Sequence, residues 1–257
     1  GNNIIAQACY QIAKEFDIEP YDEHTGKGIL RHVIGRIGQS GWMIILVTAT
    51  EQLPYKEKWV EKLTQRIPQV ETIVHNVNGK RTNVILGPKN NILYGDGTIT
   101  DHIKDLQFTL SPHSFFQVNP EQTTVLYDQA LTYADLKGDE TVIDAYCGTG
   151  TISLFLAHKA KHVIGIEIVE PAIINARENA RRNGYDNTEF IVADAAVEMP
   201  KLYKAGVRPD VIVFDPIRAG CKEEVLTSAA GMEPKRIVYV SCNPATMARD
   251  IEILTHF

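Results

Sequence analysis

Cys242 is the residue of this chain best suited to covalent chemistry. It follows a short apolar run at 236–241, and Asn243 and Pro244 come directly after it. A thiol at the carboxyl end of a parallel strand faces the region where open α/β sheets bind ligands. A free cysteine is more often a small buried hydrophobic residue, so its position alone favours a structural role. The polar residues at the ends of the other apolar runs favour the chemical interpretation.

A cofactor site is predicted around Gly148 and Gly150, which end one apolar run and begin a helical pattern at 151–160. Glycines there let the backbone approach a ligand closely. Glu167 ends the next apolar run, 19 residues after Gly148, where its carboxylate can accept hydrogen bonds from both ribose hydroxyls. The loop has fewer glycines than dinucleotide enzymes use, which fits a cofactor without a pyrophosphate. We therefore expect S-adenosylmethionine rather than NAD. Binding of NADH would instead favour the hypothesis that the protein is a dehydrogenase.

Three further residues near predicted strand ends have two interpretations each. Asp194 could accept a hydrogen bond from the adenine amino group or cap the helix that follows. Tyr146 could cover the cofactor or pack in the core. Asp144 could orient or cap the loop that contains Gly148 and Gly150, which we call the glycine loop.

The loop at 214–221 is the predicted substrate site. Asp215 and Pro216 place a carboxylate at the sheet edge with a stiff turn behind it. Arg218 could bind a phosphate or a pyrimidine oxygen, or form a surface ion pair. Cys221 lies further from the strand end, and we expect it to be structural.

The chemistry that needs a thiol such as Cys242 is methylation of a pyrimidine at C5. C5 of uracil is a poor nucleophile, but a thiolate that adds to C6 places electron density on C5. After methyl transfer, a base removes the C5 proton and the cysteine leaves. The sequence does not identify what activates the thiol.

Two patterns of predicted elements divide the chain. Residues 1–110 combine helices at 3–16 and 55–67 with strand-like runs near 28–37, 42–49 and 70–77 and shorter ones after 83. From about Pro120, five apolar runs alternate with helices, which predicts βαβ units and a parallel sheet. We therefore expect a doubly wound α/β fold, Rossmann-like, at 111–257, preceded by a smaller α+β domain at 1–110.

Composition narrows the setting and the partners. The formal charge of −6 argues mildly against a large surface for nucleic acid, although Lys27, Arg31, His32 and Arg36 form either a local RNA track or a solvated strand face. No apolar run is long enough to span a membrane. The four cysteines form no C-x-x-C pair, so we predict no metal site and a reducing cytoplasm.

Four motifs together resemble the RNA uracil-C5 methyltransferase family, which includes bacterial 23S rRNA enzymes and the tRNA enzyme that makes 5-methyluridine. The segments are 114–120 (Ser-Phe-Phe-Gln-Val-Asn-Pro), 144–150 (Asp-Ala-Tyr-Cys-Gly-Thr-Gly), 214–220 (Phe-Asp-Pro-Ile-Arg-Ala-Gly) and 240–246 (Val-Ser-Cys-Asn-Pro-Ala-Thr). The overall sequence pattern is most similar to that of the 23S rRNA branch from Firmicutes. The likeness covers nearly the whole chain.

The resemblance implies roles for particular residues. Cys242 would be the nucleophile, and the cofactor and substrate site would be lined by Gln117, Tyr146, Glu167 and Asp215. The fold would be that of an S-adenosylmethionine-dependent methyltransferase, with S-adenosylhomocysteine as product. The partner would be 23S rRNA, read by a small domain that faces RNA, and no protein partner is inferred.

The family segments that this chain lacks predict a fragment, whereas one departure at a variable position carries little weight. Asp215-Pro216-Ile217-Arg218 stands where the family often has Asp-Pro-Pro-Arg. The family's N-terminal β-barrel RNA-binding module, and the upstream cysteines that hold an iron–sulfur cluster in many members, do not occur in this chain. Its general-base glutamate follows the Ser-Cys-Asn-Pro helix, beyond the end of this sequence. The chain could therefore bind cofactor and RNA without turnover.

One alternative keeps the fold and changes the base. RNA cytosine-C5 methyltransferases also use a cysteine after the fifth strand. They carry a second cysteine directly after the Asp-Ala-Pro of the fourth strand, and Ile217 occupies that place here. The sequence therefore favours uracil.

Overall fold

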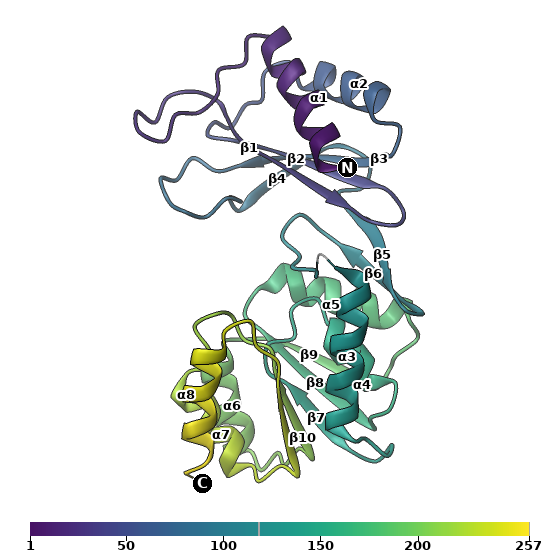
Figure 1. Cartoon of the computed structure of the whole chain (residues 1–257), viewed down its shortest axis with the longest axis vertical. Coiled ribbons are helices and arrows are strands. Elements are labelled where there is room, and N and C mark those ends of the chain that lie inside the picture. The colour runs from purple at the N-terminus through teal and green to yellow at the C-terminus, as the bar shows by residue number, and fades with distance from the viewer. Residues whose placement is uncertain (118, 257) are drawn as a thin grey trace. The chain divides into compact units, whose positions relative to one another are not determined.

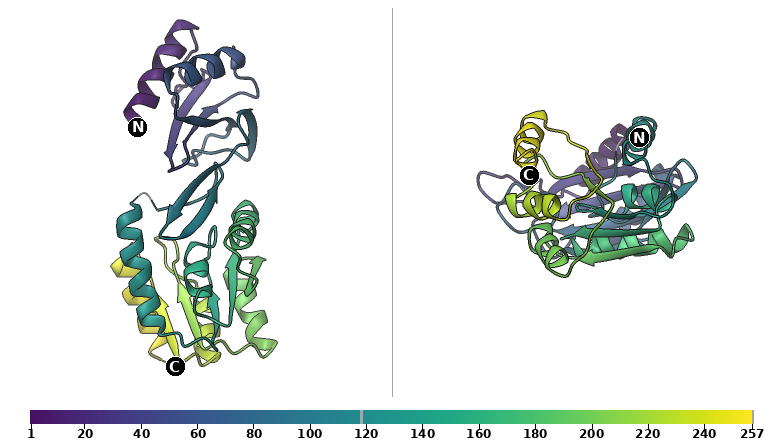
Figure 2. Two further views of the ribbon diagram at one scale, coloured as in Figure 1. Left: turned by 90° about the vertical axis from the view of Figure 1, so that its right-hand side faces the viewer. Right: turned by 90° about the horizontal axis from the view of Figure 1, so that it is seen from below.

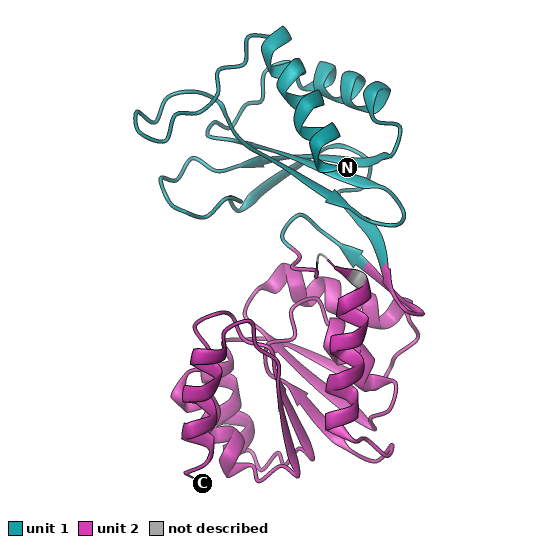
Figure 3. Ribbon diagram, in the orientation of Figure 1, with its two compact units in different colours: residues 1–101, 109–113 teal, residues 102–108, 114–257 magenta. Residues whose placement is uncertain are grey.

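The computed structural model describes residues 1–117 and 119–256 and divides into two compact units. Unit 1 comprises residues 1–101 and 109–113, and unit 2 comprises residues 102–108 and 114–257 (Figure 3). Val118, which belongs to the predicted 114–120 motif, lies outside the described residues, as does Phe257.

Unit 1 is a four-stranded mixed sheet with two helices. Its elements are α1 (Asn2–Glu15), β1 (Leu30–Ile37), β2 (Trp42–Thr48), α2 (Lys56–Arg66), β3 (Val70–Val77) and β4 (Lys89–Tyr94). The strands lie in the order β1-β2-β3-β4, and only the β2–β3 pair is parallel. Both helices pack on one face of the sheet (Figure 1), where Ile12, Ile44 and Trp59 are fully buried.

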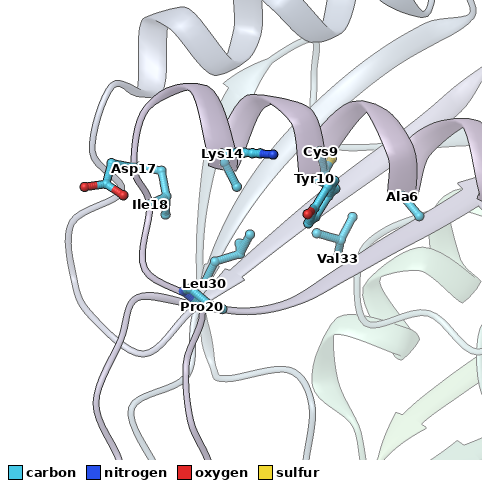
Figure 4. Close-up of a pocket in the computed structure, with 10 residues that line it drawn as sticks. Ala6, Cys9, Tyr10, Lys14, Asp17, Ile18, Pro20, Leu30 and Val33 are labelled. Atoms are coloured by element: carbon cyan, nitrogen blue, oxygen red, sulfur yellow. The ribbon is translucent and has the colours of Figure 1, made fainter.

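A cavity of about 490 Å³ lies between α1 and β1 of unit 1 (Figure 4). Its walls are mainly apolar and include Cys9, Tyr10, Leu30 and Val33. None of the predicted site residues lines it.

A two-stranded ribbon, β5 (Ile99–Ile103) and β6 (Leu106–Leu110), has residues in both units. The remaining elements form unit 2: α3 (Pro120–Ala134), β7 (Thr141–Asp144), α4 (Thr151–Ala157), β8 (His162–Glu167), α5 (Glu170–Arg182), β9 (Thr188–Val192), α6 (Ala195–Lys204), β10 (Val211–Phe214), α7 (Glu223–Gly231), β11 (Arg236–Tyr239) and α8 (Pro244–Leu254).

The sheet of unit 2 is entirely parallel, with the order β11-β10-β7-β8-β9. Helices α3, α4 and α5 lie on one side of it and α6, α7 and α8 on the other (Figures 1 and 2). The central strands are buried on both faces, which explains why they read as continuous apolar runs. The predicted doubly wound, Rossmann-like α/β fold is therefore confirmed.

The order of the strands determines where a ligand would bind in unit 2. The chain proceeds outward from β7 through β8 to β9 and then returns to β10 on the other side of β7. Ligands of such sheets bind outside the carboxyl ends of the strands at this switch point. The glycine loop follows β7 and Asp215 follows β10, so both predicted sites adjoin it.

Among the described residues, no helix combines the length and the apolar character needed to cross a bilayer.

Candidate active site

The glycine loop is held on one side and open on the other. Gly148 and Gly150 have φ values of 54° and 82°, in the left-handed region that favours glycine. A Cβ at Gly150 would lie 3.1 Å from Ala176 and 3.2 Å from Phe190, so this glycine lets the loop pack against α5 and β9. A Cβ at Gly148 would meet nothing within 4 Å. The space beside the Gly148 Cα is therefore open.

Glu167 stands beside this open space. Its Oε2 accepts a hydrogen bond from the Gly148 N–H at 3.2 Å, and its Oε1 accepts one from the Val169 N–H at 2.9 Å. A carboxylate has lone pairs for about four donors, so both oxygens can also accept ribose hydroxyls. The geometry fits the predicted cofactor contact.

Asp194 caps α6, as one of its two interpretations predicted. Its Oδ1 accepts from the Ala196 N–H at 2.9 Å, and its Oδ2 pairs with Lys222 Nζ at 2.8 Å. The hydrogen bond from Lys222, followed by that from the Ala196 N–H, lowers the pKa of Asp194. The contact with adenine stays a prediction.

Asp144 is a fully buried carboxyl at the end of β7. Ser153 Oγ donates to its Oδ2 at 2.6 Å, and Oδ1 is buried without a hydrogen-bond partner among the described residues. Burial, with a smaller contribution from the negative charge of Asp215, raises the pKa of Asp144 to about 7. Tyr146, two residues later, is half buried and packs against the core beneath α6 and α7.

Tyr127 of α3 joins several predicted residues into one cluster. Its hydroxyl lies 3.1 Å from Thr151 Oγ1 and interacts with the Gln117 side chain. Burial raises its pKa to about 12, and the charges of Asp215 and Asp144 act in the same direction. The Gln117 side chain therefore meets the Tyr127 hydroxyl, and the charges of Asp144 and Asp215 are near enough to act on it.

Asp215 is half buried at the end of β10, and burial raises its pKa to about 6. The carboxylate is thus ionised at neutral pH and has lost part of its hydration. Such a group at a strand end is suited to accept a hydrogen bond from a substrate N–H.

Cys242 is exposed, whereas Cys9, Cys147 and Cys221 are buried. It lies between β11 and α8. The loop that carries it is hydrogen-bonded to the loop after β10, because Asn243 Nδ2 donates to the backbone carbonyl of Arg218 at 3.0 Å. The single hydroxyl proton of Thr246 is shared between this carbonyl, at 3.2 Å, and that of Asn243, at 3.1 Å. The Arg218 side chain is exposed. The fold therefore joins the loop of the thiol to the loop of Asp215 and Arg218.

The basic run of unit 1 has structural contacts. Arg31 has a side chain that is 1% exposed and pairs with Glu23 at 2.8 Å. Arg36 donates to the Pro112 carbonyl at 2.9 Å, and burial lowers its pKa. Both arginines therefore have structural contacts, and the buried side chain of Arg31 fits neither an RNA track nor a solvated strand face.

Sequence reasoning missed three participants: Tyr127, Ser153 and Lys222. Tyr127 lies within a predicted helix, and nothing in a helical pattern distinguishes a tyrosine whose hydroxyl reaches a strand end. The role of Lys222 could not be predicted because its ion-pair partner, Asp194, is 28 residues away in the chain. Among the described residues, no group of three or more His, Cys, Asp or Glu is arranged to hold a metal ion.

Comparison with known proteins supports this assignment of the fold. Residues 136–255 match the family model for a methyltransferase domain. Two relatives named uncharacterized RNA methyltransferases, from Halalkalibacterium halodurans and Clostridium acetobutylicum, are 53% and 52% identical over 255 and 246 residues. They cover 98% and 94% of this chain, which spans 56% and 53% of their lengths. The chain thus spans about half the length of the curated relatives it matches.

Two solved structures are similar over most of the chain. The tRNA (uracil-54, C5)-methyltransferase of Pyrococcus abyssi in complex with S-adenosyl-L-homocysteine has a TM-score of 0.79 and 27% identity, covering 96% of this chain and 59% of its own. A SAM-dependent methyltransferase from Agrobacterium tumefaciens has a TM-score of 0.55 and 16% identity, covering 87% and 78%. The chain therefore has the Rossmann-like fold of S-adenosylmethionine-dependent methyltransferases.

Proposed function

We propose that this chain, with its methyltransferase domain, belongs to an enzyme that transfers a methyl group from S-adenosylmethionine to C5 of a uridine in 23S rRNA. The observation that supports this most directly is the exposed Cys242, on a loop hydrogen-bonded to the loop of Asp215 and Arg218. The likeness to a tRNA (uracil-54, C5)-methyltransferase agrees with uracil C5 as the target atom.

The cofactor would lie above Gly148, where the loop is open, with its ribose on Glu167 and its adenine beside Asp194. Gln117 and Tyr146 would complete the lining. When bound, S-adenosylmethionine supplies the methyl group and leaves as S-adenosylhomocysteine. The residues fit this cofactor because a carboxylate is already fixed beside an open glycine loop at the switch point.

The protein's own part in the reaction begins at Cys242. Its thiolate forms a bond to C6 of the uracil, and the electron pair of the C5–C6 double bond moves to C5 and the adjoining carbonyl. Once C5 carries the methyl group, a base removes the C5 proton. The Sγ–C6 bond then breaks, the double bond reforms, and Cys242 leaves as thiolate.

Asp215 would position the target uracil through its carboxylate, and Arg218 would bind a phosphate of the RNA. The target nucleotide must leave its stack to reach the end of a strand, as for other enzymes that modify bases. The small domain at 1–110 would face the RNA. The reaction would take place in the cytoplasm, where the cysteines remain reduced.

Nucleoside analysis tests this proposal. The protein is incubated with S-adenosylmethionine and unmodified transcripts of 23S rRNA or tRNA, and the digested RNA is analysed by liquid chromatography and mass spectrometry. We expect 5-methyluridine from 23S rRNA, none with Cys242→Ser, and an undiminished yield with Cys9→Ala, which removes a buried thiol of unit 1. Methylation of tRNA alone would contradict the rRNA substrate.

Two other outcomes would identify the alternatives. Formation of 5-methylcytidine would indicate a cytosine-C5 methyltransferase. Cofactor and RNA binding without any methylated product would indicate a chain that binds both and does not catalyse methyl transfer.

A further inference from the structure

A buried carboxylate that no motif flagged lies next to the two loops of the proposed active site. Asp250 belongs to α8, which packs beside α7, and its side chain is fully buried. Its Oδ2 accepts hydrogen bonds from the Tyr239 hydroxyl at 2.6 Å and from the Cys221 N–H at 2.7 Å. Its Oδ1 accepts from Arg249 at 2.8 Å (Nε) and 2.6 Å (the second guanidinium nitrogen). One carboxylate thus joins β11, α8 and the loop after β10.

The charge of Asp250 is well compensated. Burial alone would raise the pKa of a carboxyl, but the hydrogen bonds from Tyr239, the Cys221 N–H and Arg249 more than offset it, and the pKa of Asp250 is lowered. A buried carboxylate that lost these donors would be strongly destabilised. The arrangement therefore holds its partners in one geometry.

Three other side chains of the same segment hold the backbone of the opposite loop. Arg249 donates to the carbonyls of Ala219, at 2.9 Å, and Cys221, at 3.3 Å. Asn243 donates to the carbonyl of Arg218, and the Thr246 hydroxyl shares its proton between that carbonyl and the carbonyl of Asn243. We call Asn243, Thr246, Arg249 and Asp250 the loop clamp. Its bonds reach three carbonyls and one N–H between residues 218 and 221.

Gly220 shows how closely the clamp approaches that loop. Its φ is 77°, and a Cβ there would lie 2.6 Å from both Arg249 and Asp250 Oδ2. Any other residue at this position would displace the pair.

We propose that the loop clamp sets the spacing between Cys242 and Asp215 and thereby the rate at which Cys242 attacks a positioned uracil. This inference rests on the proposed function. Clamp residues are positioning residues, because their hydrogen bonds go to loop backbone and to one another. Asp215 precedes the clamped segment by three residues, and Cys242 precedes Asn243 directly. Loosening the clamp therefore lowers the rate constant of bond formation and leaves cofactor binding at Gly148 and Glu167 unchanged.

The test measures covalent capture by an RNA oligonucleotide that carries 5-fluorouridine, with S-adenosylmethionine present. Fluorine at C5 cannot leave as a proton, so the Cys242 adduct accumulates and its formation gives a maximal rate constant and a half-saturating RNA concentration. S-adenosylhomocysteine affinity is measured by calorimetry alongside. Thr246→Val removes one clamp hydrogen bond and should slow capture roughly 2- to 12-fold, the fold-change equivalent of one such bond. Thr246→Ser keeps the hydroxyl and should restore the rate.

Asp250→Asn removes the charge at the centre of the clamp and should slow capture by about 10²-fold, as a misplacement of about 1 Å does for positioned reactants. Asp210→Asn is the matched control. Asp210 also bonds a backbone N–H, that of Thr141, and a cation, Lys235, but at the opposite end of the strands. It should capture RNA at the wild-type rate.

The outcomes separate the two proposals. A wild-type protein that binds RNA and S-adenosylhomocysteine but forms no adduct overturns the proposed function, and the clamp with it. If the wild-type protein is captured and both Thr246→Val and Asp250→Asn are captured with the wild-type rate constant, the clamp proposal alone is overturned. A rise in half-saturating RNA concentration at unchanged rate constant, or an equal loss of rate in Asp210→Asn, also overturns it.

Discussion

Asp144 offers a sharp physical test because its environment reverses the usual behaviour of an aspartate. Its pKa rises from 3.8 to about 7 on folding, chiefly through burial. The folded state therefore binds a proton that the unfolded state releases, and stability is lost as the pH rises from about 4 to about 7. One pKa unit corresponds to about 1.4 kcal/mol, so ionised Asp144 costs the folded state about 4 kcal/mol.

Asp144→Asn removes this titration and keeps an acceptor for Ser153. We expect the stability of the variant relative to wild type to rise by about 3 kcal/mol between pH 4.5 and pH 8. The amide also places an N–H₂ in the site where Oδ1 has no partner, at a cost of about 1–3 kcal/mol. That cost is independent of pH and does not change the slope.

Hydrogen exchange measured by mass spectrometry suits this protein because it resolves β7 and β8 separately from unit 1. At each pH the ratio of variant to wild-type exchange rates for the slowest amides cancels the intrinsic rate. The ratio should fall by about 10²-fold between pH 4.5 and pH 8, since 1.4 kcal/mol is tenfold. Asp210→Asn should leave the ratio nearly constant over this range, because Lys235 and the Thr141 N–H lower the pKa of Asp210, so its carboxylate is ionised in the folded and unfolded states alike above pH 4.5. A flat ratio for Asp144→Asn would refute the buried, proton-binding carboxyl.

Three other predictions follow from the site. Glu167→Ala should weaken S-adenosylhomocysteine binding at least about 100-fold by calorimetry, because two hydrogen bonds to a charged group, each contributing about 1.5–3 kcal/mol, are lost, and an unchanged affinity would exclude Glu167 from the ribose site. Gly220→Ala should destabilise the protein by at least about 1–2 kcal/mol, the cost of a left-handed non-glycine residue, and should slow covalent capture; a wild-type melting temperature would contradict the close contact. The rate of capture should fall as the pH drops through about 6, where Asp215 becomes protonated, and Asp215→Asn should remove that step.

The sequence predicted best what depends on neighbours in the chain. Apolar runs that alternate with helices predicted the parallel sheet, and polar residues at the ends of those runs, such as Glu167 and Asp215, lie at its carboxyl edge. These predictions succeed because strand ends in parallel sheets share one edge. Cys242 as nucleophile and Arg218 as phosphate ligand stay predictions.

What the sequence did not predict depends on contacts between distant segments. Asp250 bonds Cys221, 29 residues away, and Tyr127 meets Thr151 across 24 residues. Arg31 reads as an exposed basic residue, yet it bonds carbonyls 47 and 49 residues away. These contacts form only when the chain is folded, so the spacing of residues along the sequence does not predict them.

The central claim is that Cys242 attacks C6 of a uracil. Intact-mass spectrometry of the protein after incubation with S-adenosylmethionine and a 23S rRNA hairpin containing 5-fluorouridine tests it most directly. We expect a species with the mass of protein plus RNA plus one methyl group, with the link mapped to Cys242 and absent in Cys242→Ser. An adduct that persists in Cys242→Ser, or none when RNA and cofactor are both bound, would contradict it.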